Sequence, residues 1–409
     1  MTITGTMSLT GLNPLLFAAA GTTRPKLPVA AIVTEYRENS HADVIIGKIL
    51  EGYEQDGGPG PDLTVASMYT DQVPKNDMSR DLAKKHGFPI FETIEEAITL
   101  GQDQVAVSGV LNIGEHGSYP ETPDTGQQMY PRRRFFDEVV QTFQRYGKVV
   151  PIFNDKHLSH SWEDAKHMYD TAKEMAIPFM AGSSLPVAWR VPPVTLPMNC
   201  EIEHALGYGY GPKEAYGFHA LETLQCMVER RKGGETGVVS VQAVQGEGIW
   251  QAEKEGRWSR EVFFSAVNPQ THAPIDELEK HIAEDSALYL IEYRDGLKAA
   301  IAMTDSVTRK FAFAAKLKGQ AKPAACTIRL QDGKPFRHFG YLDHAIEHMI
   351  HTGHPAYPVE RTLLTTGVLD AAMHSLAEDN RRVPTPNLDV RYRAVDWPYP
   401  PGDAPPGRR

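Results

Sequence analysis

The chain has 409 residues, of which 41% are hydrophobic and 23% charged, and its formal net charge is −10. These values are typical of a globular protein long enough for two domains, and the negative charge argues against nucleic acid as the main partner. No apolar run reaches the roughly 18 residues of a membrane span. The three cysteines are far apart and form neither a disulfide framework nor a zinc motif, which favours a reducing compartment. We therefore expect a cytoplasmic protein without a membrane partner.

Both ends of the chain have compositions that differ from the rest. Leu12–Ala20 is mildly apolar and ends in small residues, but no Lys or Arg precedes Arg24. Because a signal peptide needs a positive segment there, we expect residues 1–27 to be a flexible leader. Residues 391–409 are rich in Pro and Gly and predict an extended or disordered tail.

Strand and helix patterns alternate along residues 28–186. We expect strands at Val29–Thr34, Leu63–Tyr69, Val105–Leu111, Val149–Phe153 and Ile177–Met180, and helices at Asp43–Tyr53, Ser79–His86, Arg134–Tyr146 and Trp162–Met175. Alternation of this kind is typical of βαβ units, so we predict a Rossmann-like domain with a parallel sheet.

Residues 187–390 have a different pattern, in which strands and helices are segregated. We expect strands at Cys200–Tyr210, Gly237–Gly246, Ala287–Tyr293 and Leu297–Met303, and helices at Gly217–Lys232, Tyr341–Thr352 and Arg361–Glu378. This pattern predicts an α+β domain for substrate binding and oligomerisation, built on a large, open, mostly antiparallel sheet. The fold class is therefore α/β, with this second domain added.

The strand ends of the first domain carry an unusual density of polar residues. The loops after its strands contain Thr34, Glu35, Asn39, His41, Asp71, Glu115, His116, Asp155, Lys156, His157 and His160. Because the carboxyl ends of parallel strands meet at one edge of the sheet, we expect several of these side chains to converge in a cleft. Histidines with carboxylates can bind a divalent metal, and they can also bind the hydroxyls of a sugar. The candidate metal ligands are His116, His157, His160, Glu201, Glu203 and His219.

The order of the motifs resembles that of the Gfo/Idh/MocA family of sugar and polyol oxidoreductases. Asp155-Lys156-His157, followed by a helix, is similar to the family's Glu-Lys-Pro motif. Gly217-Phe-His-Ala-Leu-Glu222 resembles its Gly-x-His-x-x-Asp helix start, and Leu82–Ala97 is similar to the helix, strand and short helix that follow its second strand. The resemblance covers about residues 28–390.

This resemblance implies hydride transfer between a C–OH group of a small, carbohydrate-like substrate and NAD or NADP. Lys156 and His219 would manage the hydroxyl proton, and Glu222 would orient His219 or bind a sugar hydroxyl. The residues that would line the cofactor site are Thr34, Glu35, Asn39, His41, Asp71, Glu115, His116 and Asp155. The family's open sheet often mediates subunit contacts, so a homo-oligomer is expected.

Two departures from the family pattern leave alternatives open. The first strand–helix turn, residues 34–43, contains no glycine and carries the acids Glu35, Glu38 and Asp43, which would repel a pyrophosphate. The family's Asp before the active-site histidine is replaced by Ala215, and Glu214 is the nearest acid. One alternative is a dinucleotide-free, metal-assisted lyase, isomerase or hydrolase. The other is a non-catalytic sugar-binding protein.

Overall fold

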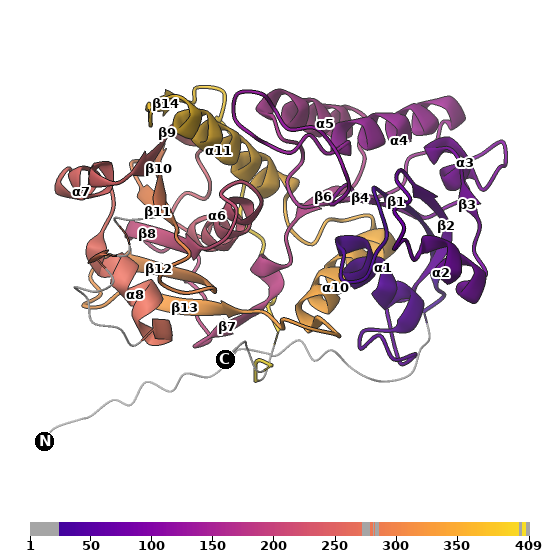
Figure 1. Ribbon diagram of the computed structural model, residues 1–409, viewed down its shortest axis with the longest axis horizontal. Helices are drawn as coiled ribbons and strands as arrows, with labels where there is room; N and C mark the ends of the chain where they lie inside the picture. Colours follow the sequence, from indigo (N-terminus) through magenta and orange to yellow (C-terminus); the bar gives the residue numbers. More distant parts are fainter. Residues whose placement is uncertain (1–23, 272–278, 281, 283–285, 401–402, 406–409) are drawn as a thin grey trace, which may run out of the picture.

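Two sheets, each covered by helices, build the protein in this computed structural model (Figure 1). The structure describes residues 24–271, 279–280, 282, 286–400 and 403–405. The flexible leader expected at residues 1–27 lies, up to residue 23, outside the described residues. Among the described helices, none combines the length and apolar character needed to cross a membrane.

The first sheet has six parallel strands in the order β3-β2-β1-β4-β5-β6. These are β1 (Leu27–Val33), β2 (Leu63–Thr70), β3 (Ile90–Phe91), β4 (Gly109–Ile113), β5 (Ile152–Asp155) and β6 (Phe179–Gly182). From β1 the chain adds β2 and β3 on one side and then β4, β5 and β6 on the other, so the strand order reverses between β1 and β4. In open α/β sheets, ligands bind at the carboxyl ends of the strands beside this reversal point. The predicted Rossmann-like arrangement is confirmed.

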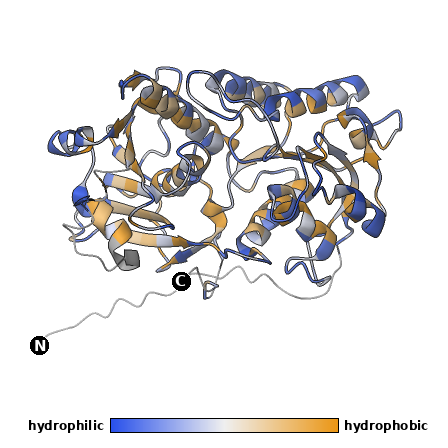
Figure 2. Ribbon diagram, viewed as in Figure 1, coloured by the Kyte–Doolittle hydropathy of each residue, from blue (hydrophilic) through white to orange (hydrophobic). Residues whose placement is uncertain are grey.

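Helices cover both faces of the first sheet, as their apolar stripes require. One face packs against α3 (Ile94–Thr99), α4 (Arg132–Tyr146) and α5 (Trp162–Glu174). The other packs against α1 (His41–Glu51) and α2 (Ser79–His86), together with α10 (Arg337–Thr352) from the far end of the chain. The helices turn hydrophobic residues to the sheet and hydrophilic ones outward (Figure 2).

The second sheet has eight strands in the order β14-β9-β10-β11-β8-β12-β13-β7, and only β11 and β8 pair in parallel. The strands are β7 (Trp189–Val191), β8 (Ile202–Gly209), β9 (Val238–Gln245), β10 (Ala287–Tyr293), β11 (Lys298–Met303), β12 (Phe311–Leu317), β13 (Ala324–Arg329) and β14 (Val383–Pro384). The inner face packs on α6 (Ala215–Val228) and α11 (Val359–Ala377). The predicted mostly antiparallel domain is confirmed.

The outer face of the second sheet is covered as well, which the sequence did not reveal. Helices α7 (Glu247–Lys254) and α8 (Arg260–Thr271) lie against it, at the left of Figure 1. Trp258, Val262 and Phe263 form an apolar cluster there with sheet residues such as Tyr208 and Leu288. The sheet is therefore not free on either face within the described part of the chain.

Candidate active site

The loops that follow β1, β4 and β5 meet at the reversal point of the first sheet, as predicted. Lys156 is the first residue after β5, and it adopts a left-handed backbone with φ = 63°. Its amide donates a hydrogen bond to the carbonyl of Gly182 at the end of β6 (3.1 Å). Positive φ is uncommon for a lysine and is found mainly where the surrounding structure enforces it, often at functional sites.

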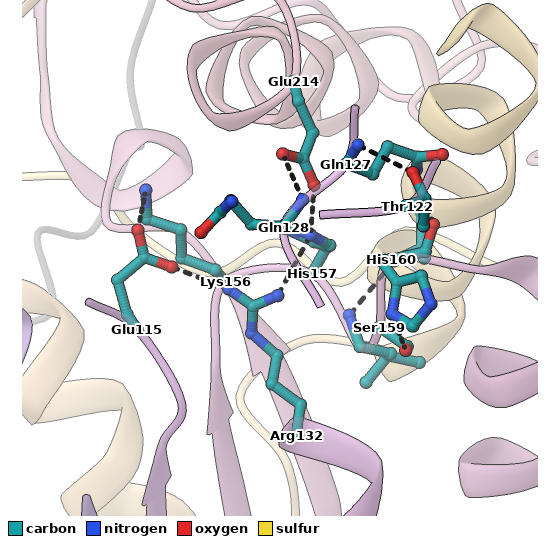
Figure 3. A network of polar contacts seen from close by, with 12 residues as sticks. Glu115, Thr122, Gln127, Gln128, Arg132, Lys156, His157, Ser159, His160 and Glu214 are labelled. Atoms are coloured by element: carbon teal, nitrogen blue, oxygen red, sulfur yellow. Dashed lines mark hydrogen bonds and ion pairs between the residues drawn. The ribbon is translucent and has the colours of Figure 1, made fainter. Parts of the chain in front are cut away.

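Glu115 pairs with two buried cations at this edge, at one end of a network of polar contacts (Figure 3). One carboxylate oxygen lies 3.1 Å from Lys156 Nζ, and the other accepts a hydrogen bond from Arg132 Nη2 at 2.6 Å. Burial alone would raise the pKa of Glu115, but the Lys156 ammonium and the Arg132 guanidinium outweigh it and hold that pKa well below its usual range. Glu115 is therefore an anion that holds a buried lysine in place.

Arg132 continues this network toward the second domain. Its Nη1 lies 3.1 Å from His157 Nε2, and the same histidine nitrogen lies 3.6 Å from Glu214, which precedes α6 (Figure 3). Burial and the neighbouring Arg132 lower the pKa of His157 to about 4. His157 is therefore neutral at pH 7 and links the two domains behind Lys156.

His219, on the first turns of α6, faces the end of β6. Its Nδ1 lies 2.7 Å from the hydroxyl of Ser183, which leaves Nε2 for a ligand. The side chain is nearly buried among the rings of Tyr216, Phe218 and Phe311. Burial first, and then the positive charge of Lys156, hold the pKa of His219 well below its usual range. A neutral imidazole of this kind can accept a proton.

Glu222 lies one helical turn beyond His219 but is fully buried and does not reach an open surface. It accepts hydrogen bonds from the amide of Ser183 (3.4 Å) and the hydroxyl of Thr365 (2.9 Å). Burial raises the pKa of Glu222 to about 7. Since Ser183 also contacts His219, Glu222 acts through Ser183 as a positioning residue, and the structure gives it no direct place at the substrate.

His41 and Asp155 form a second group at the same edge. His41 is the first residue of α1, and its Nδ1 lies 2.6 Å from an oxygen of the buried Asp155. His116 lies beside it, with ring centroids 5.6 Å apart, and burial lowers the pKa of His116 to about 4. The other oxygen of Asp155 and Nε2 of His116 are buried without a hydrogen-bond partner. Unpaired buried polar atoms of this kind are typical of a site that takes water or a ligand.

A nicotinamide dinucleotide is the cofactor that this kind of fold implies, and its pyrophosphate would lie on the turn between β1 and α1. That turn is filled by its own residues. Tyr36 is fully buried and Glu35 nearly so. The hydroxyl of Thr34 donates a hydrogen bond to the carbonyl of Glu115 (2.6 Å), which ties the loops after β1 and β4 together.

Two amides beside the start of α1 already have side-chain partners within the chain. The hydroxyl of Ser40 accepts from the amide of Asp43 (3.3 Å), and the Asp43 carboxylate accepts from the amide of Asn39 (2.9 Å). A carboxylate thus takes the place at which a phosphate would approach. Together with the side chains that fill the turn, this arrangement does not fit a pyrophosphate in the manner of the glycine-rich loop.

The candidate metal ligands are spread over several places in the structure. Among the described residues, no three His, Cys, Asp or Glu side chains form a group that could hold a metal ion. Glu201 and Glu203 are exposed at the start of β8, and Glu201 pairs with Lys232 and Lys318. The carbonyl of His160 accepts a hydrogen bond from Gln127 (2.6 Å), away from Lys156 (Figure 3). His116, His157 and His219 lie near the carboxyl edge of the first sheet but contact different partners.

Asp71 follows β2 and takes part in a polar network of its own. It accepts hydrogen bonds from the hydroxyls of Tyr69 (2.7 Å) and Tyr119 (2.6 Å) and pairs with Arg134. Burial would raise its pKa, but these donors lower it below the usual range. Its carboxylate oxygens are thus occupied by protein donors.

Sequence reasoning missed two residues that the site depends on. For Arg132-Arg133-Arg134 the sequence favours a solvent-exposed helix start over a grip on a phosphate or carboxylate, but this preference is wrong for Arg132, which is buried against the carboxylate of Glu115. Its neighbours Arg133 and Arg134 are exposed as expected. No pattern in the sequence marks Ser183. It contacts His219 only because the end of β6 and the start of α6 meet in space.

Solved structures with the same fold exist, although the sequence itself has no match among family models or curated proteins. GenD2 from gentamicin A biosynthesis, solved in complex with NAD, superposes with a TM-score of 0.55 at 15% identity, over 91% of this chain and 99% of that one. Apo scyllo-inositol dehydrogenase from Lactobacillus casei gives a TM-score of 0.53 at 10% identity, over 89% and 99%.

A third solved structure has the same relation to this chain. It is an oxidoreductase from Agrobacterium radiobacter in complex with NAD+, L-tartaric acid and magnesium, with a TM-score of 0.52 at 13% identity, over 88% of this chain and 98% of that one. Identities this low establish the fold and leave the activity to be argued from the site. The chain therefore has the two-domain fold of the Gfo/Idh/MocA-type dehydrogenases.

Proposed function

We propose that this chain is an enzyme that moves a proton at a hydroxyl-bearing carbon of a small, carbohydrate-like substrate. The observation that carries the proposal is the pairing of Lys156 with Glu115 at the reversal point of the sheet, together with a neutral His219 facing the neighbouring strand end. Stability alone does not explain this placement, because the desolvation of a buried ion pair can cost as much free energy as the pairing returns.

Each residue has a distinct task in this proposal. The Lys156 ammonium donates a hydrogen bond to a substrate oxygen and stabilises negative charge that develops there. Nε2 of His219 accepts a proton from the substrate, because Nδ1 is engaged by Ser183. Glu115 and Arg132 hold Lys156 in place, and Glu222 holds Ser183.

The fold supports an oxidoreductase as one form of this activity. GenD2 and the Agrobacterium radiobacter oxidoreductase were solved with NAD and NAD+, so hydride transfer to NAD or NADP is the reaction that these neighbours suggest. The turn before α1 is closed by its own hydrogen bonds, which favours a second form of the activity. In this form the proton is moved but the substrate is not oxidised, as in a lyase or isomerase. Homo-oligomeric assembly and a cytoplasmic location remain proposals from the resemblance.

The test is a screen that detects both forms. The purified full chain is incubated with polyols, aldoses and their keto derivatives. One series contains NAD+ or NADP+ and is followed by nicotinamide absorbance, and the other is in D2O and is followed by loss of C–H signals in proton NMR. We expect Lys156→Met and His219→Asn each to lower the observed rate at least about 100-fold, which is typical for loss of a general acid or base.

Matched controls exist on the surface of the molecule. Lys166→Met and His374→Asn remove an exposed lysine and an exposed histidine, each beside an aspartate. These variants should keep the rate of the parent chain. Equal rates for Lys156→Met and the parent chain would contradict the proposal. Sugar binding without any turnover would instead favour the non-catalytic alternative.

A further inference from the structure

We infer that the turn between β1 and α1 serves the substrate and does not hold a dinucleotide, and that His41, oriented by Asp155, is a third proton-transferring residue of the site. The inference rests on the proposed function, because it places His41 at the same substrate as Lys156. It assigns a catalytic task to a turn that in this fold holds a cofactor.

The pair has the geometry of an oriented general base. Asp155 ends β5 and its side chain is 1% exposed, whereas the His41 side chain is 15% exposed. Their 2.6 Å contact directs Nδ1–H of His41 to the carboxylate, which leaves the lone pair of Nε2 at the opposite edge of the ring. A buried carboxylate in this position also stabilises the imidazolium that forms when Nε2 accepts a proton.

The groups around His41 come from several elements and include both apolar and charged residues. Phe339 of α10 packs edge-on against the ring at 5.3 Å, and His116 lies on another side. His41 is also close enough to influence the pKa values of Glu115, His219 and His338. Glu115 is the partner of Lys156, so His41, Lys156 and His219 belong to one electrostatic neighbourhood.

Two unpaired buried atoms next to the pair point to a ligand. One oxygen of Asp155 and Nε2 of His116 have no hydrogen-bond partner, although both are shielded from bulk water. A purely structural pair would leave such atoms unpaired at a cost in free energy, because each has lost its hydrogen bonds to water. A polyhydroxylated substrate offers the hydroxyl donors that both atoms need.

With these residues the chemistry balances without a hydride acceptor. Next to a substrate carbonyl, His41 Nε2 takes the proton of a C–H bond, whose electron pair forms a C=C bond. The carbonyl π pair then forms an O–H bond with a proton from Lys156. His41 then returns its proton to the former carbonyl carbon, where the electron pair of the C=C bond forms the new C–H bond. The hydroxyl on the carbon that first lost its proton gives its own proton to Lys156, and the electron pair of that O–H bond forms the new C=O bond, so the isomerisation costs the substrate no electrons.

The first arm of the test measures dinucleotide binding directly. NADH and NADPH are titrated into the full chain up to about 1 mM, with nicotinamide fluorescence and native mass spectrometry as readouts. We expect no stoichiometric complex with either cofactor. A complex of one dinucleotide per chain with a Kd below about 1 mM would overturn the inference and leave the proposed function standing as an oxidoreductase.

The second arm measures the state of His41 by nitrogen NMR of histidine-labelled protein, with its signals assigned by their loss in His41→Asn. We expect the Nδ1–H tautomer in the parent chain, and a shift toward the Nε2–H tautomer in Asp155→Asn, because the amide no longer offers a carboxylate to Nδ1–H. Asp370→Asn, beside the exposed His374, is the matched control and should leave His41 unchanged. The Nε2–H tautomer in the parent chain would overturn the inference even if Asp155→Asn fails to fold.

The third arm separates this inference from the proposed function. In the solvent-exchange assay, His41→Asn should lower the rate about 100-fold, with His374→Asn as control. An unchanged rate in His41→Asn, with a rate lost in Lys156→Met, would overturn the role of His41 only. A rate kept in both variants would overturn both.

Discussion

At the scale of single residues, Glu115 is the side chain on which the candidate site depends most. It binds two cations that are themselves buried, with Arg132 1% and Lys156 4% exposed. Removing one partner from such a network leaves charges in a medium of low polarity without compensation. The Glu115 carboxylate therefore stabilises the folded chain and also holds Lys156 in position.

Glu115→Gln should lower the free energy of unfolding by about 3–5 kcal/mol, because two buried cations lose their counter-charge. Urea denaturation followed by circular dichroism measures this change. Glu95→Gln is the control, since Glu95 pairs with Arg145 at an exposed position and such pairs contribute about 0–1 kcal/mol. A change below 1 kcal/mol in Glu115→Gln would contradict the network as described.

Glu222 makes stability depend on pH in a defined direction. Its pKa is raised by burial to about 7 in the folded chain, above its ordinary value of 4.5. The protonated form is thus favoured by folding, so stability present at pH 4.5 is lost as the pH rises through 7. Glu222→Gln should remove this loss, which amounts to at most about 3 kcal/mol. Urea unfolding at pH 5 and pH 8 compares the two chains, and parallel profiles would disprove the assignment.

At the scale of elements, the end of β6 is shaped by the close approach of Glu222. Gly182 has φ = 129°, and a Cβ there would lie 2.6 Å from a Glu222 oxygen and 3.0 Å from the Thr362 hydroxyl. Only glycine permits this backbone together with this contact. The strand end in turn presents Ser183 to His219.

Gly182→Ala should therefore lower stability by about 2–4 kcal/mol and displace the ring of His219, since strain and overlap act at the same point. Gly147→Ala is the matched control, because φ is 65° and nothing lies within 4 Å of the added Cβ. It should cost only about 1 kcal/mol. Thermal unfolding and the NMR signals of His219 test both variants, and equal effects would refute the role of Gly182.

The sequence predicted those elements whose apolar residues follow a clear period. It placed β5 at Val149–Phe153, whereas the strand is Ile152–Asp155, because Asn154 and Asp155 are polar yet buried. The strands β12 and β13 were not predicted, since their alanines carry little strand preference.

The site was predicted in its location and only partly in its contacts. Lys156 and His219 follow from motif positions, and Glu115 and His41 from the convergence of strand-end loops. The pairing of His41 with Asp155 spans 114 residues, and the burial of Arg132 depends on how α4 meets that edge. Contacts of this kind are set by tertiary packing and leave no periodic pattern in a single sequence.

At the scale of the whole molecule, α7 and α8 change which surface is available for assembly. The resemblance suggested subunit contacts through an open sheet, but Phe263 and Val262 of α8 already bury the outer face of the sheet within the subunit. A homo-oligomer that uses this face would have to displace both helices. Any assembly of this chain is therefore expected to use another surface.

Phe263→Ala tests this, because a core contact within one subunit and a contact between subunits respond differently to protein concentration. We expect a loss of about 3–4 kcal/mol that is the same at low and high concentration. Glu261→Ala, at an exposed position of the same helix, should have little effect. A loss that shrinks as concentration rises would show that the face lies between subunits.

The chain crosses between the two domains more than once, so a helix from the far end of the chain helps to cover the first sheet. After β6 the chain enters the second sheet, it returns as α10 to cover the first, and α11 then packs against elements of both. Near the C-terminus, Trp397 packs against the first domain beside His348, with ring centroids 5.0 Å apart. A fragment ending near residue 186 would therefore expose the face of the first sheet that Leu342, Ile346 and Met349 cover. Because each domain depends on the other in this way, we expect calorimetry to record a single cooperative unfolding transition for both.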